Sequence, residues 1–538
     1  MISRRAPNAA RGRRYIMPGR GTRSRAAAVS LRSMTSSDGD SNDDDDDDDD
    51  EKERRRGGGR GSLLFLSPSN WPEPDASAAG TRTMALLRHF SSHCPPLFDS
   101  VHFGCGAGGG MPSSSSSSSS SIFWHRIRPN RADEMHELLN RINDDHGPIR
   151  AVVFDRFHAE EAYSFRVRDT CPNALLVLDM QDVHSLRLGR QQVVEEMDDD
   201  PTSVAMMTDR LASAVAEFDP SSPNRDARDA FLRELASVHR SDLVLVCSAP
   251  EMGMLVSWGV PAWKLVLAPF FCSDVDVDVD RTGTTMSLPP FGGRRDFAFV
   301  GGFRHPPNVD SVRVLRREVW PLIRSRMPRA RVRVFGAYPT PDILSLHDED
   351  VGFLVRGRVD DLDDALRRSR VLLAPLRFGA GIKGKIVDAW RCDCPVVTTR
   401  VGAEGTTTTT TTTTKTAIDD DGGDDLGART TIADNCRWGG IIADDAVDFA
   451  KAAVELHERE DLWNRCRDNG TGSLRRIFNG RVNLPVVERG IRDGIADLAK
   501  QRTMDIFGSI LWRDARRSTE YFSRWIELKE TLNGAKDK

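Results

Sequence analysis

Long hydrophobic runs are absent from this sequence of 538 residues. No segment contains the roughly eighteen consecutive apolar residues that a membrane-spanning helix requires, so we expect no transmembrane segment. An apolar secretory signal is also missing near the start of the sequence. The nine cysteines are scattered and odd in number, and we interpret them as reduced thiols of an intracellular protein.

An excess of positive charge is absent as well. The formal net charge is -5, which gives no electrostatic reason to expect a nucleic-acid partner. The spacing of a metal site is also missing, because Cys392 and Cys394 are too close together for a zinc pair and have no partner cluster. We therefore expect neither nucleic acid nor a bound metal, and we interpret these two cysteines as structural.

Residues 1–61 are not expected to fold alone. Residues 1–37 contain many arginines and several serines but no acidic residue, a composition that fits an organellar presequence. An acidic run at 43–50 and a basic, glycine-rich stretch at 54–61 follow, and a disordered tail without targeting meaning explains all three equally well. We expect a location in the cytoplasm or, if the arginine-rich start is a presequence, in an organelle.

The rest of the chain is long enough for two domains. Predicted strands and helices alternate from Ser62 onward, which favours α/β domains with doubly wound parallel sheets. We place an N-terminal domain at 62–272, with a serine-rich insertion, and a linker at 273–295. A C-terminal domain follows at 296–490, with a threonine- and aspartate-rich insertion at 406–430, and helices occupy 491–538.

Charged side chains and a histidine follow two successive predicted strands of the first domain, 149–154 and 174–178. These side chains are Asp155, Glu160, Asp182 and His184. Ligands of α/β domains bind beyond the carboxyl ends of the strands, so this edge is a candidate site. His184 alone would be better interpreted as a structural histidine, but the neighbouring acids favour a site.

Two further features of the first domain concern Gly80 and Glu251. Gly80 lies where the first predicted strand gives way to the first helix, and a glycine there permits close backbone approach to a ligand. Glu251 follows Ser248 by three residues, the spacing of a helix capping box. We therefore interpret Glu251 as a cap rather than a catalyst.

The segment from 369 to 405 is the most informative part of the sequence. A predicted strand at 371–376 is followed by a turn with Gly379 and Gly381, a helix at 384–391, and a second strand at 395–399. Its chemical groups are Lys383, Lys385 and, one turn inside the helix, Asp388. Backbone N–H groups at a helix N-terminus beside two ammonium groups suit a diphosphate with a ribose next to it. A glycine-rich turn alone would instead favour a plain connection between strand and helix.

Two stretches of sequence resemble the donor-binding segment of group 1 (family 4) glycosyltransferases. The first is PLRFGAGIKGKIVDAW at 375–390, followed by PVVTTRVGAEG at 395–405, and the second is FVGGFRHPPNVDSV at 299–312. Similarity extends to LVLDMQDVHSLRLGRQ at 176–191 and RSDLVLVCSAPEMGML at 240–255. The resemblance covers most of residues 62–538 in order and spacing.

The resemblance implies a GT-B fold, in which two Rossmann-like domains face a cleft and the last helices cross back to the first domain. It implies retaining transfer of a sugar from a nucleotide-diphosphate sugar, held by the second domain, to a carbohydrate, lipid or protein-linked acceptor, held by the first. No cofactor is obligatory for many members. Basic side chains and backbone N–H groups would then balance the charge of the departing diphosphate.

The resemblance also implies roles for the candidate residues. On the donor side, Lys385, Lys383 and Arg304 would neutralise diphosphate, Asp388 would hold ribose, and Gly302, Gly379 and Gly381 would allow close approach. His184 and Asp155 would be catalytic residues that orient the acceptor or the donor sugar, with Gly80, Glu160 and Asp182 on the acceptor side.

The chain departs from the family pattern at two places. Many members carry two glutamates in the donor loop, and although the second matches Asp388, the first falls on Ala380. Members often place Arg and Lys after the first strand of the second domain, where this chain has Gly302 and Pro307. These departures leave an alternative open, namely a catalytically inactive GT-B protein that binds a nucleotide or glycan. An interaction scaffold that uses the acidic and serine tracts is a third reading, based on composition alone.

Overall fold

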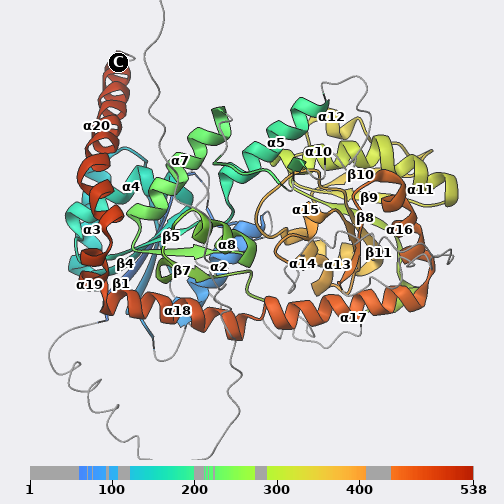
Figure 1. Ribbon diagram of the computed structural model, residues 1–538, viewed down its shortest axis with the longest axis horizontal. Coiled ribbons are helices and arrows are strands. Elements are labelled where there is room, and N and C mark those ends of the chain that lie inside the picture. The colour runs from blue at the N-terminus through green and yellow to red at the C-terminus, as the bar shows by residue number, and fades with distance from the viewer. Residues whose placement is uncertain are drawn as a thin grey trace, which may run out of the picture. The chain divides into compact units, whose positions relative to one another are not determined.

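The computed structural model describes residues 60–69, 71–74, 77–92, 96–106, 122–198, 211, 214–215, 217–221, 225–272, 288–406 and 438–536. The serine tract, nearly all of the N-terminal extension and most of the predicted linker and threonine-rich insertion lie outside these residues. The described chain forms two parallel β-sheets, each flanked by helices (Figure 1). This confirms the predicted α/β class with two doubly wound domains.

The first sheet has seven strands in the order β3-β2-β1-β4-β5-β6-β7, and every neighbouring pair is parallel. Its strands are β1 (Ser62–Ser67), β2 (Ser100–Cys105), β3 (Ile122–Arg126), β4 (Ile149–Asp155), β5 (Leu175–Asp179), β6 (Leu243–Val246) and β7 (Leu265–Leu267). Its helices are α2 (Ala78–Ser92), α3 (Ala132–His146), α4 (Arg156–Thr170), α5 (His184–Asp198), α7 (Arg225–Arg240) and α8 (Ala249–Ser257).

The second sheet has six parallel strands in the order β10-β9-β8-β11-β12-β13. They are β8 (Arg295–Val300), β9 (Val332–Phe335), β10 (Phe353–Gly357), β11 (Ser369–Ala374), β12 (Val396–Thr398) and β13 (Gly440–Ile442). The helices around it are α10 (Pro306–Val314), α11 (Trp320–Arg326), α12 (Pro341–Leu344), α13 (Leu362–Arg368), α14 (Gly384–Arg391), α15 (Arg400–Ala403), α16 (Ala446–Glu458) and α17 (Glu460–Ile477).

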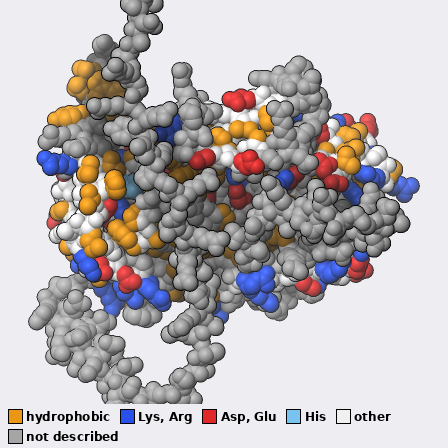
Figure 2. Space-filling model, viewed as in Figure 1, with side chains coloured by type: hydrophobic (Ala, Val, Ile, Leu, Met, Phe, Trp, Pro, Cys, Tyr) orange, Lys and Arg blue, Asp and Glu red, His pale blue; other side chains and the backbone are white. Residues whose placement is uncertain are grey.

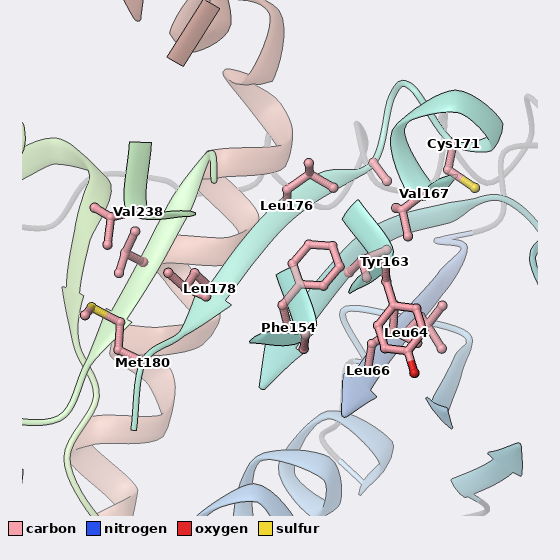
Figure 3. Packing of buried hydrophobic residues seen from close by; sticks show 14 of the residues in the cluster. Leu64, Leu66, Phe154, Tyr163, Val167, Cys171, Leu176, Leu178, Met180 and Val238 are labelled. Carbon is pink, nitrogen blue, oxygen red and sulfur yellow. The ribbon is translucent and has the colours of Figure 1, made fainter. Parts of the chain in front are cut away.

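The middle residues of the central strands are mostly apolar, as expected where helices cover both faces of each sheet. In β1, Leu64 and Leu66 pack with Phe154 of β4 and Leu178 of β5 beneath Tyr163 of α4 (Figure 3). Since successive strand residues point to opposite faces, their neighbours in β1 join a separate cluster on the other face. The two clusters fix the strands, and therefore fix the loops at their carboxyl ends.

One predicted helix, residues 309–326, is divided in the structure. A π-helical turn, Leu315–Val319, separates α10 from α11. Pro321 follows directly after this turn and has no backbone N–H to donate to the carbonyl four residues earlier. The wider turn accommodates the missing hydrogen bond.

The C-terminal helices connect the two sheets. Helix α17 packs on α14, α16 and β13, whereas α18 (Gly480–Ala496) already packs on β4, β5, β6 and β7 of the first sheet. The backbone N–H of Cys272 donates to Phe478 O at 2.7 Å, and that of Gly480 to Cys272 O at 2.6 Å, where the chain returns. The chain therefore leaves the second sheet before residue 490, where we had placed the domain boundary.

The last helices, α19 (Leu498–Met504) and α20 (Ile506–Lys536), stay with the first sheet. Trp512 Nε1 donates to Arg240 O at 2.7 Å and fixes one side of α20 against α7. Large hydrophobic side chains are exposed on α20, including Tyr521, Trp525 and Leu528, and hydrophobic atoms are visible along this helix in Figure 2. Within the described ranges, no helix has both the length and the apolar character needed to cross a bilayer.

Candidate functional site

The glycine loop, residues 375–383, joins the carboxyl end of β11 to the N-terminus of α14. Gly379 has φ of +155° and Gly381 has φ of +64°, conformations that a residue with a side chain rarely adopts. Helix α14 then begins at Gly384, as predicted. The predicted strand, loop and helix are thus confirmed, and the loop lies at the sheet edge where ligands of such folds bind.

Lys385 lies in the first turn of α14, where its ammonium group contacts neutral groups. Its Nζ donates to Asn308 Oδ1 at 2.7 Å and lies 4.8 Å from the ring centre of Phe299. Burial lowers the pKa of Lys385 to about 7. Among the described residues, no carboxylate lies within ion-pair distance of it. A partly buried ammonium group without a carboxylate nearby is energetically unfavourable, and an anionic ligand would relieve this cost.

Lys383 is held differently. Its Nζ donates to Gly381 O at 2.8 Å and lies 3.7 Å from Glu404 Oε2. Burial lowers the pKa of Lys383, and Glu404 acts in the opposite direction. Lys383 therefore stabilises the shape of the glycine loop, and its charge is partly matched within the protein.

Asn308 links Lys385 to the turn that follows β8. Its Nδ2 donates to Gly302 O at 2.9 Å, and a Cβ on Gly301 would lie 2.6 Å from its side chain. The predicted Gly302 thus contributes its carbonyl to this turn. The predicted Arg304 instead lies over the ring of Tyr338, 3.6 Å from its centre, and no described contact joins it to Lys385. Sequence analysis did not identify Asn308, although it lies inside one of the two diagnostic strings.

Asp388 lies on α14, one turn from Lys385. Arg391 Nη1 is 3.6 Å from Asp388 Oδ1 on the same helix, and the Asp388 side chain is 31% exposed. Burial raises the pKa of Asp388 to about 6, against the opposing effect of Arg391. The carboxylate is therefore accessible and ionised at neutral pH, as hydrogen bonding to sugar hydroxyls would require.

The first sheet brings Asp155 to its edge at the end of β4. Asp155 Oδ2 accepts from Ser67 Oγ at 3.1 Å and from Arg156 Nη2 at 2.9 Å. Arg156 has φ of +65°, a conformation that costs energy in a residue with a side chain, and its guanidinium folds back on the carboxylate. The ion pair orients Asp155 without burying it.

Asp182 and His184 follow the neighbouring strand β5. Asp182 Oδ2 accepts from Arg187 Nε at 2.8 Å, and the guanidinium of Arg187 also contacts His184 Nδ1. Burial, followed by the charge of Arg187, lowers the pKa of His184 to about 4. His184 is consequently a neutral imidazole at physiological pH, and because its Nδ1 accepts from Arg187, its Nε2–H group is available to donate a hydrogen bond.

Two predicted site residues are not brought to this edge. Glu160 is 1% exposed, and its carboxylate accepts from Arg240 Nε and Ser237 Oγ, both at 2.8 Å. This buried pair joins α4 to α7. A Cβ on Gly80 would lie 2.5 Å from the carbonyl oxygen of Glu73, so Gly80 accommodates its own chain. The contacts of both residues are therefore those of structural positions within the first domain.

The two sheets meet at the glycine loop. Gly381 N donates to Glu251 Oε1 at 2.9 Å, and a Cβ on Gly381 would lie 3.0 Å from Asp182 Cβ. Arg190 Nη1 donates to Gly379 O at 2.8 Å. The glycine loop of the second sheet therefore contacts the loop that carries Asp182 and His184. The close approach that we predicted for Gly381 is, in the structure, an approach to Asp182.

Residues 294–421 match the family model of glycosyl transferases group 1. This segment contains β8, β11, the glycine loop and α14. It thus includes Lys385, Asp388 and Asn308, whereas Asp155 and His184 lie outside it. No curated protein matches the chain significantly. The match supports the enzyme class predicted from the sequence, a glycosyltransferase.

The fold is similar to those of several solved glycosyltransferases. HepE of Anabaena in complex with UDP aligns over 80% of this chain and 100% of its own, with 9% identity and a TM-score of 0.51. Sucrose-phosphate synthase of Thermosynechococcus elongatus aligns over 81% and 99%, with 14% identity and a TM-score of 0.52. A glycosyltransferase of Rickettsia africae aligns over 81% and 98%, with 9% identity and a TM-score of 0.52. The arrangement of two sheets is therefore the GT-B fold.

Proposed function

We propose that this chain is a retaining glycosyltransferase that moves a sugar from a nucleotide-diphosphate sugar to a carbohydrate, lipid or protein-linked acceptor. The observation that carries the proposal is Lys385, a partly buried ammonium group with Asn308 as its hydrogen-bond partner and no carboxylate within ion-pair distance in the described chain. It lies in the first turn of α14, inside the matched segment. A diphosphate supplies the negative charge that this position lacks.

The donor would lie along the carboxyl edge of the second sheet. Lys385 and the first N–H groups of α14 would bind the diphosphate, since the N-terminus of a helix attracts anions. Asp388, one turn further on, would accept hydrogen bonds from ribose. Lys383 would act mainly through the glycine loop, because Glu404 and the carbonyl of Gly381 already engage its ammonium group.

The acceptor and the transferred sugar would meet the edge of the first sheet. Asp155 and His184 lie on two adjacent strand ends, and each is oriented by an arginine, Arg156 and Arg187 respectively. The Nε2–H group of a neutral His184 can donate a hydrogen bond to a sugar hydroxyl oxygen, and the Asp155 carboxylate can accept one from a sugar hydroxyl. These groups orient the sugars, while the basic groups across the interface stabilise the leaving diphosphate.

UDP-sugars are the first donors to test. HepE has been solved with UDP and with UDP-glucose, and its fold aligns with 80% of this chain in both structures. That likeness concerns the fold, so GDP- and ADP-sugars belong in the same panel. The proposal of a UDP-sugar donor for this chain is supported by this likeness and by the anion position at Lys385.

Release of nucleoside diphosphate from each donor tests the function. The full chain is incubated with UDP-, GDP- and ADP-sugars, with and without simple glycosides as acceptors, beside Lys385→Ala and Lys385→Arg. We expect slow release from one donor class, a loss of about tenfold or more in Lys385→Ala, and partial retention in Lys385→Arg. Saturable donor binding without release under any condition would instead identify an inactive binding protein.

A further inference from the structure

One carboxylate oxygen of Glu251 accepts hydrogen bonds from two backbone N–H groups, one in each domain. Val183 N and Gly381 N both donate to Glu251 Oε1, each at 2.9 Å. Val183 lies between Asp182 and His184, whereas Gly381 lies four residues before Lys385. The Glu251 side chain is almost fully buried, with 4% of the residue exposed. A single atom therefore joins the loop of the proposed acceptor side to the loop of the proposed donor side.

We propose that Glu251 is a positioning residue of the transfer reaction, which sets the separation between the His184 loop and the Lys385 helix. The catalytic part of this inference rests on the proposed function. The structural part, namely that Glu251 fixes the glycine loop, can be tested whether or not the protein is an active enzyme.

The carboxylate of Glu251 is held from its own side as well. Ser248 Oγ donates to Glu251 Oε2 at 2.7 Å, and Ser248 caps α8 by accepting from Glu251 N at 3.4 Å. Ser248 thus caps α8 as predicted, but the Glu251 carboxylate binds Ser248 Oγ in place of the backbone N–H that a capping box uses, and this contact orients the side chain that reaches across the interface. With both oxygens engaged, the carboxylate keeps one position relative to β6 and α8.

Arg190 holds the other glycine of the loop. It donates to Gly379 O at 2.8 Å and to Val215 O at 3.1 Å. Gly379 and Gly381 are thus both fixed by side chains from the first sheet, and both have positive φ. A loop of this conformation would gain freedom if either contact were lost. Since α14 follows directly, Lys385 would shift with it, and misplacement by about 1 Å can reduce a reaction rate about 100-fold.

The reach of the side chain, rather than its charge, is what the geometry requires. Glu251→Gln keeps the length and one carbonyl oxygen, which can accept from Val183 and Gly381, while its amide group can donate to Ser248 Oγ. Glu251→Asp keeps the charge but is one methylene shorter, so it cannot reach both amides. Ser248→Ala removes the cap of α8 and the contact with Glu251 Oε2 but leaves the amides of Val183 and Gly381 on Oε1, so it separates loss of the cap from loss of reach.

Two measurements on the full chain test the inference. The first is hydrogen exchange of peptides that cover residues 375–386, measured by mass spectrometry without ligand. We expect exchange to rise about tenfold or more in Glu251→Asp and Glu251→Ala, to change less than about twofold in Glu251→Gln, and to rise less in Ser248→Ala than in Glu251→Asp. The second measurement compares the effect of each substitution on kcat with its effect on the Kd for nucleoside diphosphate. Glu251→Asp should lower kcat about tenfold to 100-fold, a larger effect than the accompanying rise in the Kd for nucleoside diphosphate.

The outcomes separate the inference from the proposed function. Equal exchange of the glycine loop in wild type and Glu251→Asp would overturn the inference even if the enzyme is active. Retained turnover in Glu251→Asp together with loss in Glu251→Gln would also overturn it, because the charge would then be the essential property. If the wild type turns over no donor, the proposed function fails, and the exchange pattern still decides whether Glu251 fixes the loop.

Discussion

Arg190 and Glu404 form a bidentate ion pair, with guanidinium nitrogens 2.7 and 2.9 Å from the two carboxylate oxygens. Arg190 lies on α5 beside the first sheet, and Glu404 follows α15 beside the second. The Arg190 side chain is almost fully buried, whereas that of Glu404 is partly exposed. The pair therefore connects the two domains at the glycine loop, and a charge left behind by removing either partner would be poorly solvated.

Removal of Arg190 should destabilise the protein. We expect Arg190→Ala to lower the free energy of unfolding by about 2–3 kcal/mol, below the usual cost of breaking a fully buried pair because water reaches Glu404. A double-mutant cycle with Glu404→Ala, followed by thermal or urea unfolding, isolates the pair. Additive effects of the two substitutions, with coupling below about 0.5 kcal/mol, would contradict this interpretation.

Donor affinity should depend on pH through Lys385. Burial lowers the pKa of Lys385 to about 7 in the free protein, so a proton must be taken up when diphosphate binds above that pH. The affinity for nucleoside diphosphate should therefore fall as pH rises above 7, by up to about tenfold for each pH unit. Calorimetric titrations at pH 6, 7, 8 and 9 measure this dependence.

Lys385→Arg is the control for the pH dependence, because a guanidinium group stays charged throughout this range. Its affinity should vary little between pH 7 and 9. A steep dependence that persists in Lys385→Arg would assign the titration to another group. A flat profile in the wild type would show that Lys385 does not bind the diphosphate.

Asp388 should make the protein less stable as pH rises, whereas an ion-paired carboxylate usually makes a protein more stable as pH rises. Burial raises its pKa from 3.8 to about 6, so the folded protein holds a proton that the unfolded chain has lost between about pH 4 and 6. Stability should therefore fall as pH rises through this window. Asp388→Asn should remove this slope and stabilise the protein at pH 7 by about 1 kcal/mol, a value reduced for the partial exposure of the side chain.

The same substitution should weaken binding of nucleoside diphosphate several-fold, because an amide replaces a carboxylate acceptor for ribose. Urea unfolding at pH 4, 5, 6 and 7 and calorimetry at pH 7 measure the two effects. A destabilised Asp388→Asn protein at pH 7 would refute the linkage, and unchanged affinity would refute the ribose contact.

His184 should affect transfer and leave donor binding unchanged. It lies on the first sheet and is uncharged at neutral pH, since burial and Arg187 lower its pKa to about 4. His184→Ala should reduce the transfer rate at least about tenfold, with donor Kd within about twofold. The transfer rate of the wild type should also show no inflection near pH 6.5 that can be assigned to His184. The pH profiles of wild type and His184→Asn should therefore have the same shape in this range. Loss of donor binding in His184→Ala would place this residue on the donor side instead.

The local structure of the site could be predicted because it follows from short-range patterns. Helix α14 has the predicted bounds, and Ser248 is the predicted N-cap of α8. The glycines at 379 and 381 lie in the predicted turn, where both have positive φ. Each of these features depends on residues within a few positions of one another.

The contacts between the sheets could not be predicted because their partners are remote in sequence. Arg190 and Glu404 are separated by 214 positions, and nothing in either local pattern indicates the other. Glu160 follows a strand end, as site residues do, but its place on α4 turns it toward Arg240 in the interior. Glu251 illustrates both cases. Its place three residues after the N-cap Ser248 could be predicted from the local sequence, whereas its hydrogen bond with Gly381 could not.

Calorimetric titration of the full chain with UDP-, GDP- and ADP-sugars tests the central claim most directly, with Lys385→Ala and Asp388→Ala titrated beside it. The account predicts saturable binding of one donor class at neutral pH, weakened about tenfold or more by Lys385→Ala and also weakened by Asp388→Ala. Absence of binding to every donor by folded wild-type protein would contradict it.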